Sequence, residues 1–313
     1  MNSFDLYVDS AANIPDELVA RHDIRMIPYT CTVNGVERLT YEKDRPFREA
    51  AKEFYSLLRA GADIKTSLVS EDAFVTAIEP SLAAGRDALV ITITESLSGT
   101  SRQAQLARET LLQRYPERKI FVIDSCNASM GEGLLALKAA DLRDMGESVD
   151  ACAEWVQENR YKMNSYLTVD DLKFLRKSGR ISMVKAIAGT ILNIKPIIRA
   201  DGESPARLAF FSKEKGRKKA ISALLKSFDE NVINPESQTL AITHTDCEEE
   251  ALALKDALLA RGARDVVVEF YDLCTGSHVG PGTIALFFMG KDRRDPAPQE
   301  KPLRAGARVP VRY

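Results

Sequence analysis

The sequence predicts an α/β protein with two domains, the first built on a parallel sheet and the second on a mixed sheet. The chain has 313 residues, 45% of them hydrophobic, which is enough for about two domains with well-filled cores. In the first half, short β-branched segments alternate with longer amphipathic ones, as in parallel sheets with right-handed helical crossovers. Near Asn164 this alternation gives way to a pattern that predicts a β-hairpin, so we expect a second domain from there onward.

Residues 1–163 are expected to form an N-terminal α/β/α domain. Apolar residues occupy consecutive positions in Ala88-Leu89-Val90-Ile91, which is typical of a strand covered on both faces. The predicted strands are residues 4–8, 87–94 and 119–124, and a turn at residues 9–15 follows the first of them. Apolar periodicity and capping residues such as Ser70 predict helices at residues 46–60, 70–84, 99–115, 131–144 and 149–163.

Residues 164–290 are expected to form a C-terminal α/β domain with a mixed sheet. A turn at residues 201–205 joins the two strands of the predicted hairpin, residues 196–199 and 206–211. Further strands are predicted at residues 166–169, 240–244, 266–271 and 283–289, and helices at 170–176, 183–192, 213–228 and 248–260. Residues 291–313 are rich in proline and arginine without periodicity, so we expect a flexible tail.

Charge and cysteine content exclude several classes of function. The net charge is −2, and backbone binding to nucleic acid needs a concentrated basic face, so no nucleic-acid partner is expected. The five cysteines are scattered without a Cys-x-x-Cys or Cys/His spacing, so we expect reduced thiols and neither a metal nor another cofactor. The N-terminus has no signal-peptide pattern, and no apolar run approaches about 18 residues. We therefore expect a cytoplasmic protein.

Three short polar segments, each beside an apolar one, carry the chemistry of the chain. They are Lys65-Thr66-Ser67, Ser96-Leu97-Ser98-Gly99-Thr100 and the segment 277–282, which contains His278. They offer hydroxyls, an imidazole and backbone N–H groups, but no cluster of acids or thiols. Such donors fit a small anion, a carboxylate or a phosphate, better than a metal or acid–base chemistry.

Ser98 and Gly99 lie between a predicted strand and the helix that follows it. In a parallel sheet, ligands bind at the carboxyl ends of strands, and a helix N-terminus favours anions. Ordinary structural roles remain alternatives: Ser98 as a helix cap, Thr66 and Ser67 as turn residues, and His278 as a structural histidine in a Gly/Pro-rich loop. No acid stands at a spacing that nominates it as a partner for His278, and no Gly-x-Ser-x-Gly elbow occurs.

Together with the segments around them, these motifs resemble the DegV family, whose members include the fatty-acid-binding subunits of bacterial fatty acid kinases. The resemblance covers residues 4–289, nearly the whole chain except the tail. Its pieces stand in the family's order: Val8-Asp9-Ser10-Ala11-Ala12-Asn13-Ile14-Pro15, Ile27-Pro28-Tyr29 with Tyr41, Thr66-Ser67, Leu97-Ser98-Gly99-Thr100, Val122-Ile123-Asp124-Ser125 with Ser129-Met130-Gly131, Leu175-Arg176-Lys177-Ser178-Gly179-Arg180-Ile181, Ile194-Lys195-Pro196-Ile197 and His278-Val279-Gly280-Pro281-Gly282.

The resemblance implies a two-domain fold that holds a long-chain fatty acid between and inside its domains. It implies carboxylate contacts from Thr66, Ser98 and His278, with Ser67 and Gly99 beside them. It also implies that the chain presents the carboxylate to a separate ATP-dependent fatty acid kinase subunit for acyl-phosphate formation, and is not catalytic alone. Arg180 then corresponds to an arginine that lies toward the kinase-facing surface.

The sequence departs from the family pattern at a few positions and leaves alternatives open. Glu95 stands where the family usually has a hydroxyl, so it must point away from the anion, or the headgroup differs. The alternatives are an acyl-ester hydrolase with Ser98 as nucleophile and His278 as base, or a carrier of another anionic lipid.

The apolar residues 187–192 either line an acyl tunnel or form a core helix. The basic residues between 213 and 219 form a solvated helix face or a surface for transient contact with an acidic partner or a membrane. Acyl-chain preference and oligomeric state are not determined by the sequence.

Overall fold

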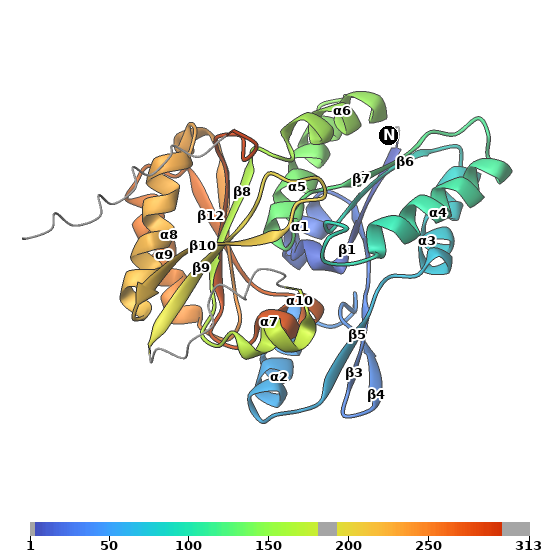
Figure 1. Ribbon diagram of the computed structural model, residues 1–313. Helices are drawn as coiled ribbons and strands as arrows, with labels where there is room; N and C mark the ends of the chain where they lie inside the picture. Colours follow the sequence, from blue (N-terminus) through green and yellow to red (C-terminus); the bar gives the residue numbers. More distant parts are fainter. Residues whose placement is uncertain (1–3, 181–192, 296–313) are drawn as a thin grey trace, which may run out of the picture.

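The computed structural model describes residues 4–180 and 193–295, which form an α/β fold built on three sheets (Figure 1). The first sheet is parallel, with the order β2-β1-β6-β7. Its strands are β1 (Phe4–Asp9), β2 (Ile24–Ile27), β6 (Asp87–Thr92) and β7 (Ile120–Asp124). The turn after β1 is a short 3-10 helix (Ser10–Ala12), and α1 (Asp16–Arg21) leads into β2.

Helices cover both faces of this parallel sheet. On one face lie α3 (Glu71–Ala83) and α4 (Thr100–Arg114), and on the other α5 (Met130–Asp144) and α6 (Val149–Asn159). Ala88 and Val90 pack in the hydrophobic cluster of α3 and α4, whereas Leu89 and Ile91 pack with α5. The consecutive apolar residues of β6 are therefore explained by burial on both sides.

The second sheet is mixed, with the order β10-β9-β8-β13-β11-β12. Only β11 and β12 pair in parallel, and α9 (Glu248–Leu259) connects them. Its strands are β8 (Met163–Thr168), β9 (Ile194–Ala200), β10 (Leu208–Lys215), β11 (Thr239–His244), β12 (Asp265–Phe270) and β13 (Ile284–Met289). Helices α8 (Arg217–Asn231) and α9 cover its outer face (Figure 1), and a 3-10 turn (Pro235–Ser237) precedes β11. The predicted α/β class, with a parallel and a mixed sheet, is confirmed.

Helix α5 lies between the two large sheets and contacts strands of both. It carries small residues such as Gly133 and Ala136, and most of its side chains are buried. A Cβ atom at Gly133 would come within 2.4 Å of the carbonyl oxygen of Ala12, so only glycine fits there. The first two turns of α5 are buried on all sides, and its apolar side chains join the hydrophobic cores of the two halves into one cluster.

A third, antiparallel sheet of three short strands projects beside the other two. It consists of β3 (Thr30–Val33), β4 (Val36–Leu39) and β5 (Ile64–Ser67), in the order β4-β3-β5. The helix that follows β4, α2 (Phe47–Arg59), packs against the C-terminal half of the chain, on β12 and α10 (Leu273–Val279). The small sheet and α2 therefore belong to the N-terminal half by sequence but contact the C-terminal half in space.

Several predicted elements differ from the observed ones. The predicted helix at residues 213–228 begins only at Arg217, because Lys213 and Lys215 pair with β9 as the end of β10. Residues 149–163 were predicted as one helix, but α6 ends at Asn159 and Met163 starts β8. The predicted helix at residues 170–176 is α7 (Lys173–Ser178). The predicted helix at residues 183–192 lies outside the described residues.

The small sheet was missed because its strands are short and β4 is exposed along its whole length. One local signal for it exists in Asn34-Gly35. Both residues have positive φ, 52° and 82°, as a type I′ hairpin turn requires. Among residues 4–180 and 193–295, no helix is both long enough and apolar enough to cross a membrane.

Residues 291–295, the start of the segment expected to be a flexible tail, instead pack against the body of the protein. The guanidinium of Arg293 donates hydrogen bonds to the carbonyl oxygens of Asp201, Cys126 (2.9 Å) and Arg160 (3.2 Å). It thereby ties the turn of the β9–β10 hairpin to the loop after β7. Burial lowers the pKa of Arg293 to about 10, so the side chain stays charged at neutral pH.

Replacing Arg293 by alanine is expected to lower the free energy of unfolding by about 2–4 kcal/mol, since three part-buried hydrogen bonds from a charged donor to carbonyl oxygens are lost. Chemical denaturation of the two proteins would measure this difference. The matched control is Arg294→Ala, because the guanidinium of Arg294 is exposed and pairs with Asp292. Equal unfolding curves for Arg293→Ala and the unmodified protein would contradict the anchoring role.

Candidate functional site

A cavity of about 410 Å³ lies between the two halves of the chain, at the carboxyl end of β6. This volume is in the range of small-molecule pockets. The N-terminal half contributes residues 66–68, 93–99 and 126–129, and the C-terminal half contributes α7, α10 and the ends of the mixed sheet. All five residues predicted to bind a ligand, together with Arg180, line it: Thr66, Ser67, Ser98, Gly99, Arg180 and His278.

One side of the cavity is the N-terminus of α4. Gly99 is the cap residue of this helix, and Ser98 precedes it, so the first turn of α4 faces the cavity. No acidic residue occupies that first turn, and the helix dipole favours an anion there. The Oγ atom of Ser98 lies 2.8 Å from Oγ1 of Thr100 and accepts a hydrogen bond from the hydroxyl of Tyr29 at 3.4 Å.

The opposite side is formed by Thr66 and His278. Thr66 lies in β5, paired with Cys31 of β3, and not in a turn, which was the alternative structural role for it. His278 lies in α10, not in a loop. Asp272 caps this helix by accepting hydrogen bonds from the backbone N–H groups of Cys274 (2.8 Å) and Thr275 (3.1 Å). Thr66 Oγ1 and His278 Nε2 are 3.0 Å apart and share a hydrogen bond across the cavity wall.

The charge on His278 is controlled by its surroundings. Burial, and then the positive charge of Arg180, lower the pKa of His278 to about 4. The imidazole is therefore neutral at pH 7, with one nitrogen able to donate and the other able to accept a hydrogen bond. Arg180 itself is exposed and lines the mouth of the cavity, so it supplies a positive charge there while remaining accessible to solvent.

We expect an NMR titration of the His278 imidazole to have its midpoint near pH 4, since the neutral form is stabilised in the folded state. Because the pKa of His278 falls on folding, its contribution to the free energy of unfolding is fully present above the pKa of the unfolded chain, about 6.5. That contribution is lost as the pH falls through the pKa of the folded state, about 4. The spectrum of His278→Ala assigns the resonance. A midpoint at or above 6.5 would contradict a buried, neutral histidine beside Arg180.

The remaining walls combine apolar side chains with one acid at the rim. Leu167, Leu175 and Phe287 belong to the apolar part, contributed by the C-terminal half. Glu95 lines the edge but is exposed, and its backbone N–H donates to the carboxylate of Asp124 at 3.1 Å. Residues 187–192, considered as a tunnel lining, lie outside the described residues.

Among the cavity residues that were not predicted as site residues are Tyr29 and Cys274. Tyr29 is fully buried, and burial raises its pKa well above the ordinary value, so its hydroxyl stays protonated and can donate. Cys274 is buried beside it on α10, and burial raises the pKa of its thiol. The Ile27-Pro28-Tyr29 motif was the available signal for Tyr29, whereas Cys274 belongs to a helix that the sequence did not predict.

The geometry does not assemble a nucleophile–base pair. Within residues 4–180 and 193–295, the hydrogen-bond partners of Ser98 are Thr100 and Tyr29, and that of His278 is Thr66. A serine hydrolase needs the base in hydrogen-bond contact with the nucleophile and a third group orienting the base. The site is instead a set of neutral donors around a cavity, with two exposed arginines, Arg180 and Arg207, in its lining.

An α/β fold on three sheets, with a donor-lined cavity at the junction of its halves, defines a class of ligand-holding proteins. Comparison with known sequences identifies the family within that class. The family model described as "Uncharacterised protein, DegV family" matches residues 3–291. The chain belongs to the DegV family. It is 35% identical over 297 residues to a DegV domain-containing protein of Clostridium perfringens, covering 95% of this chain and 100% of the relative. A DegV domain-containing protein of Lactococcus lactis, YteA, is 33% identical, with 94% and 100% covered.

Solved structures of the family share the fold. A DegV family protein from Thermus thermophilus, described for its fatty acid binding, has a TM-score of 0.79 and 27% identity, covering 91% of this chain and 98% of that one. DegV of Bacillus subtilis, described as a fatty acid binding protein, has a TM-score of 0.77 and 25% identity, with 93% and 100% covered. Members of this family therefore bind fatty acids.

Proposed function

We propose that this protein binds a long-chain fatty acid, with its carboxylate held between the N-terminus of α4 and the Thr66–His278 pair. The observation that carries the proposal is the convergence of Thr66, Ser98, Gly99 and His278 on one cavity from elements far apart in the sequence. Fatty acid binding by the Thermus thermophilus and Bacillus subtilis relatives supports the same ligand class.

The energetics of such a ligand agree with the chemistry of the site. Burying an acyl chain contributes about 0.8 kcal/mol per methylene, so a dozen methylenes give on the order of 10 kcal/mol. A carboxylate left without partners in an apolar site would offset much of this gain. Hydroxyl, imidazole and backbone donors satisfy the carboxylate without neutralising it, and Arg180 adds a positive charge from the rim.

The protein is further proposed to present this carboxylate to a separate ATP-dependent kinase, and to act as a cytoplasmic carrier that is not catalytic alone. Thr66, Arg180 and His278 line both the inner cavity and a second, outer groove of about 900 Å³, so the carboxylate site adjoins a surface that a partner can reach. In that reaction a carboxylate oxygen attacks the γ-phosphorus of ATP, the bond to the β-phosphate oxygen breaks, and ADP leaves. Arg180 is exposed, and in this proposal it is the residue that faces the kinase.

Native mass spectrometry of the protein purified from a bacterial host tests the ligand. We expect one fatty acid per chain, identified after extraction. An empty protein that also fails to take up added palmitate would reject fatty acid binding, and extraction of a different anionic lipid would redirect the assignment to that lipid. Acyl-phosphate formation in a mixture of this protein, ATP and a fatty acid kinase tests the presentation step. At palmitate concentrations that saturate both proteins, we expect Arg180→Ala to abolish acyl-phosphate formation, and an unchanged rate would contradict the role of Arg180.

A further inference from the structure

The outer groove is a second cavity on the solvent side of the Thr66–His278 pair. Its lining includes five basic residues, Arg59, Lys65, Lys173, Lys177 and Arg180, but only two acids, Asp170 and Asp171. It shares Thr66, Arg180 and His278 with the inner cavity. A group attached to the carboxylate of a ligand in the inner cavity would therefore project into this groove.

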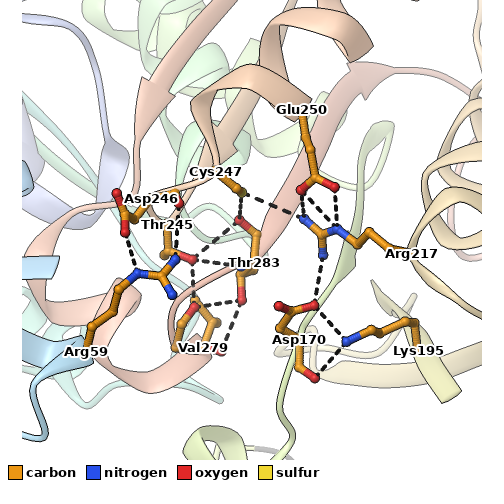
Figure 2. Close-up of polar contacts among 11 residues, drawn as sticks. Arg59, Asp170, Lys195, Arg217, Thr245, Asp246, Cys247, Glu250, Val279 and Thr283 are labelled. Carbon is orange, nitrogen blue, oxygen red and sulfur yellow. Dashed lines mark hydrogen bonds and ion pairs between the residues drawn. The ribbon is translucent and has the colours of Figure 1, made fainter. Parts of the chain in front are cut away.

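The acid Asp170 does not cancel the positive charge of the groove, because it belongs to a separate network (Figure 2). Its carboxylate lies 2.7 Å from Nζ of Lys195 and 3.7 Å from Nη1 of Arg217. Arg217 also pairs with Glu250 at 2.7 Å. The two acids and two bases of this network, Asp170, Glu250, Lys195 and Arg217, have no net charge together. Asp170 therefore does not neutralise the basic residues that line the groove.

Two of the basic residues are likewise neutralised by their own partners. The guanidinium of Arg59 pairs with Asp246 at the edge of the groove (Figure 2). Nζ of Lys173 lies 2.9 Å from the carboxylate of Asp171. These pairs leave Lys65, Lys177 and Arg180 as the residues that determine the charge of the groove.

Two of these three cations, Lys65 and Lys177, share a single carboxylate, that of Asp63. The Nζ atoms of Lys65 and Lys177 lie 3.9 Å and 3.8 Å from the two oxygens of Asp63, and both side chains are more than three-quarters exposed. Within residues 4–180 and 193–295, no carboxylate lies within ion-pair distance of Arg180, whose guanidinium donates to the carbonyl oxygen of Ser178 at 2.6 Å. The groove therefore carries an excess of two positive charges directly beside the proposed carboxylate site.

We propose that the outer groove is a phosphoryl-binding subsite, in which Lys65, Lys177 and Arg180 hold the phosphate of an acyl phosphate whose chain fills the inner cavity. The assignment rests on the proposed function for the position of the chain. A phosphate monoanion or dianion matches an excess of two positive charges, and arginine and lysine are its usual ligands. A fatty acid carboxylate alone carries one negative charge and would balance only one of these two positive charges. The subsite would thus retain the phosphorylated product more tightly than the substrate.

The test compares palmitate with a hydrolysis-resistant acyl phosphonate of equal chain length, in which a CH₂ group replaces the bridging oxygen. Isothermal titration calorimetry measures both ligands on the unmodified protein and on Lys65→Gln/Lys177→Gln. We expect the double variant to bind the phosphonate about tenfold more weakly and palmitate less than about threefold more weakly. Raising the salt concentration should weaken phosphonate binding to the unmodified protein more than to the variant.

The matched control is Lys218→Gln/Lys219→Gln, which removes two exposed charges from α8, on the outer face of the mixed sheet. It should bind both ligands as the unmodified protein does. Equal losses for the two ligands in the groove variant, or no loss for either, would overturn the subsite. If the unmodified protein fails to bind palmitate, the proposed function fails, whereas phosphonate binding that depends on Lys65 and Lys177 would still support the subsite.

Discussion

Replacing His278 by alanine is expected to weaken palmitate binding by about 10- to 100-fold, the largest effect of any single change in the cavity. A hydrogen bond to a charged group contributes about 1.5–3 kcal/mol, and every 1.4 kcal/mol is tenfold in affinity. The hydrogen bond between Nε2 of His278 and Oγ1 of Thr66, 3.0 Å long, already holds the imidazole ring in position before the ligand arrives. Isothermal titration calorimetry with palmitate measures the loss.

A second variant separates the loss of a donor from damage to the fold. Thr66→Val keeps the shape of the side chain but removes the hydroxyl that holds His278, so we expect a smaller loss, of about tenfold. Thermal unfolding of both ligand-free variants provides the control for folding. If both variants fold normally and bind palmitate with unchanged affinity, the carboxylate does not bind at the Thr66–His278 pair.

The second large effect is expected on stability, at Gly276. A Cβ atom at this position in α10 would lie 1.8 Å from the hydroxyl oxygen of Tyr55 and 2.7 Å from its Cζ atom. That hydroxyl donates to the carbonyl oxygen of Tyr271 at 2.8 Å and so joins α2 to the start of α10. Gly276→Ala must displace the ring and break this bond, so we expect a loss of about 3 kcal/mol in the free energy of unfolding. Differential scanning calorimetry should show a decrease of about 5–10 °C in the Tm.

A double-mutant cycle with Tyr55→Phe tests the cause of that loss. The phenylalanine lacks the hydroxyl oxygen closest to the new Cβ atom, so Gly276→Ala should cost less in the Tyr55→Phe background than in the unmodified protein. Additive effects of the two changes would mean that the glycine is required for a reason other than contact with Tyr55.

The polar residues of the cavity show how far sequence reasoning extends. Ser98 and Gly99 could be placed because they follow a buried strand and precede a long helix, a local pattern with a known consequence. Thr66 and His278 were nominated by their motifs, but their settings were wrong: one is in a strand and the other in a helix. Helix α10 contains Gly276 and ends before Gly280, residues typical of a loop, and it forms because Asp272 caps it and α2 packs on it.

The outer groove could not be predicted from the sequence for a related reason. Lys65 and Lys177 are more than a hundred positions apart, and only the tertiary structure brings both within ion-pair distance of Asp63. Asp170 appears in the sequence as an acid among these bases. Its pairing with Lys195 and Arg217 depends on strand order in the mixed sheet, which the local sequence does not specify.

By itself, the sequence determined the α/β class, the parallel arrangement of the first sheet, the family, and six of the residues that line the cavity. These features depend on local periodicity, capping and motif order, which act over a few residues and are visible in the chain. The tertiary structure alone decided that α5 lies between both sheets, that α2 packs on the C-terminal half, and that Arg293 anchors the β9–β10 hairpin. The reason is physical: burial and ion pairing between distant segments depend on how whole elements pack, and many packings are compatible with the same local pattern.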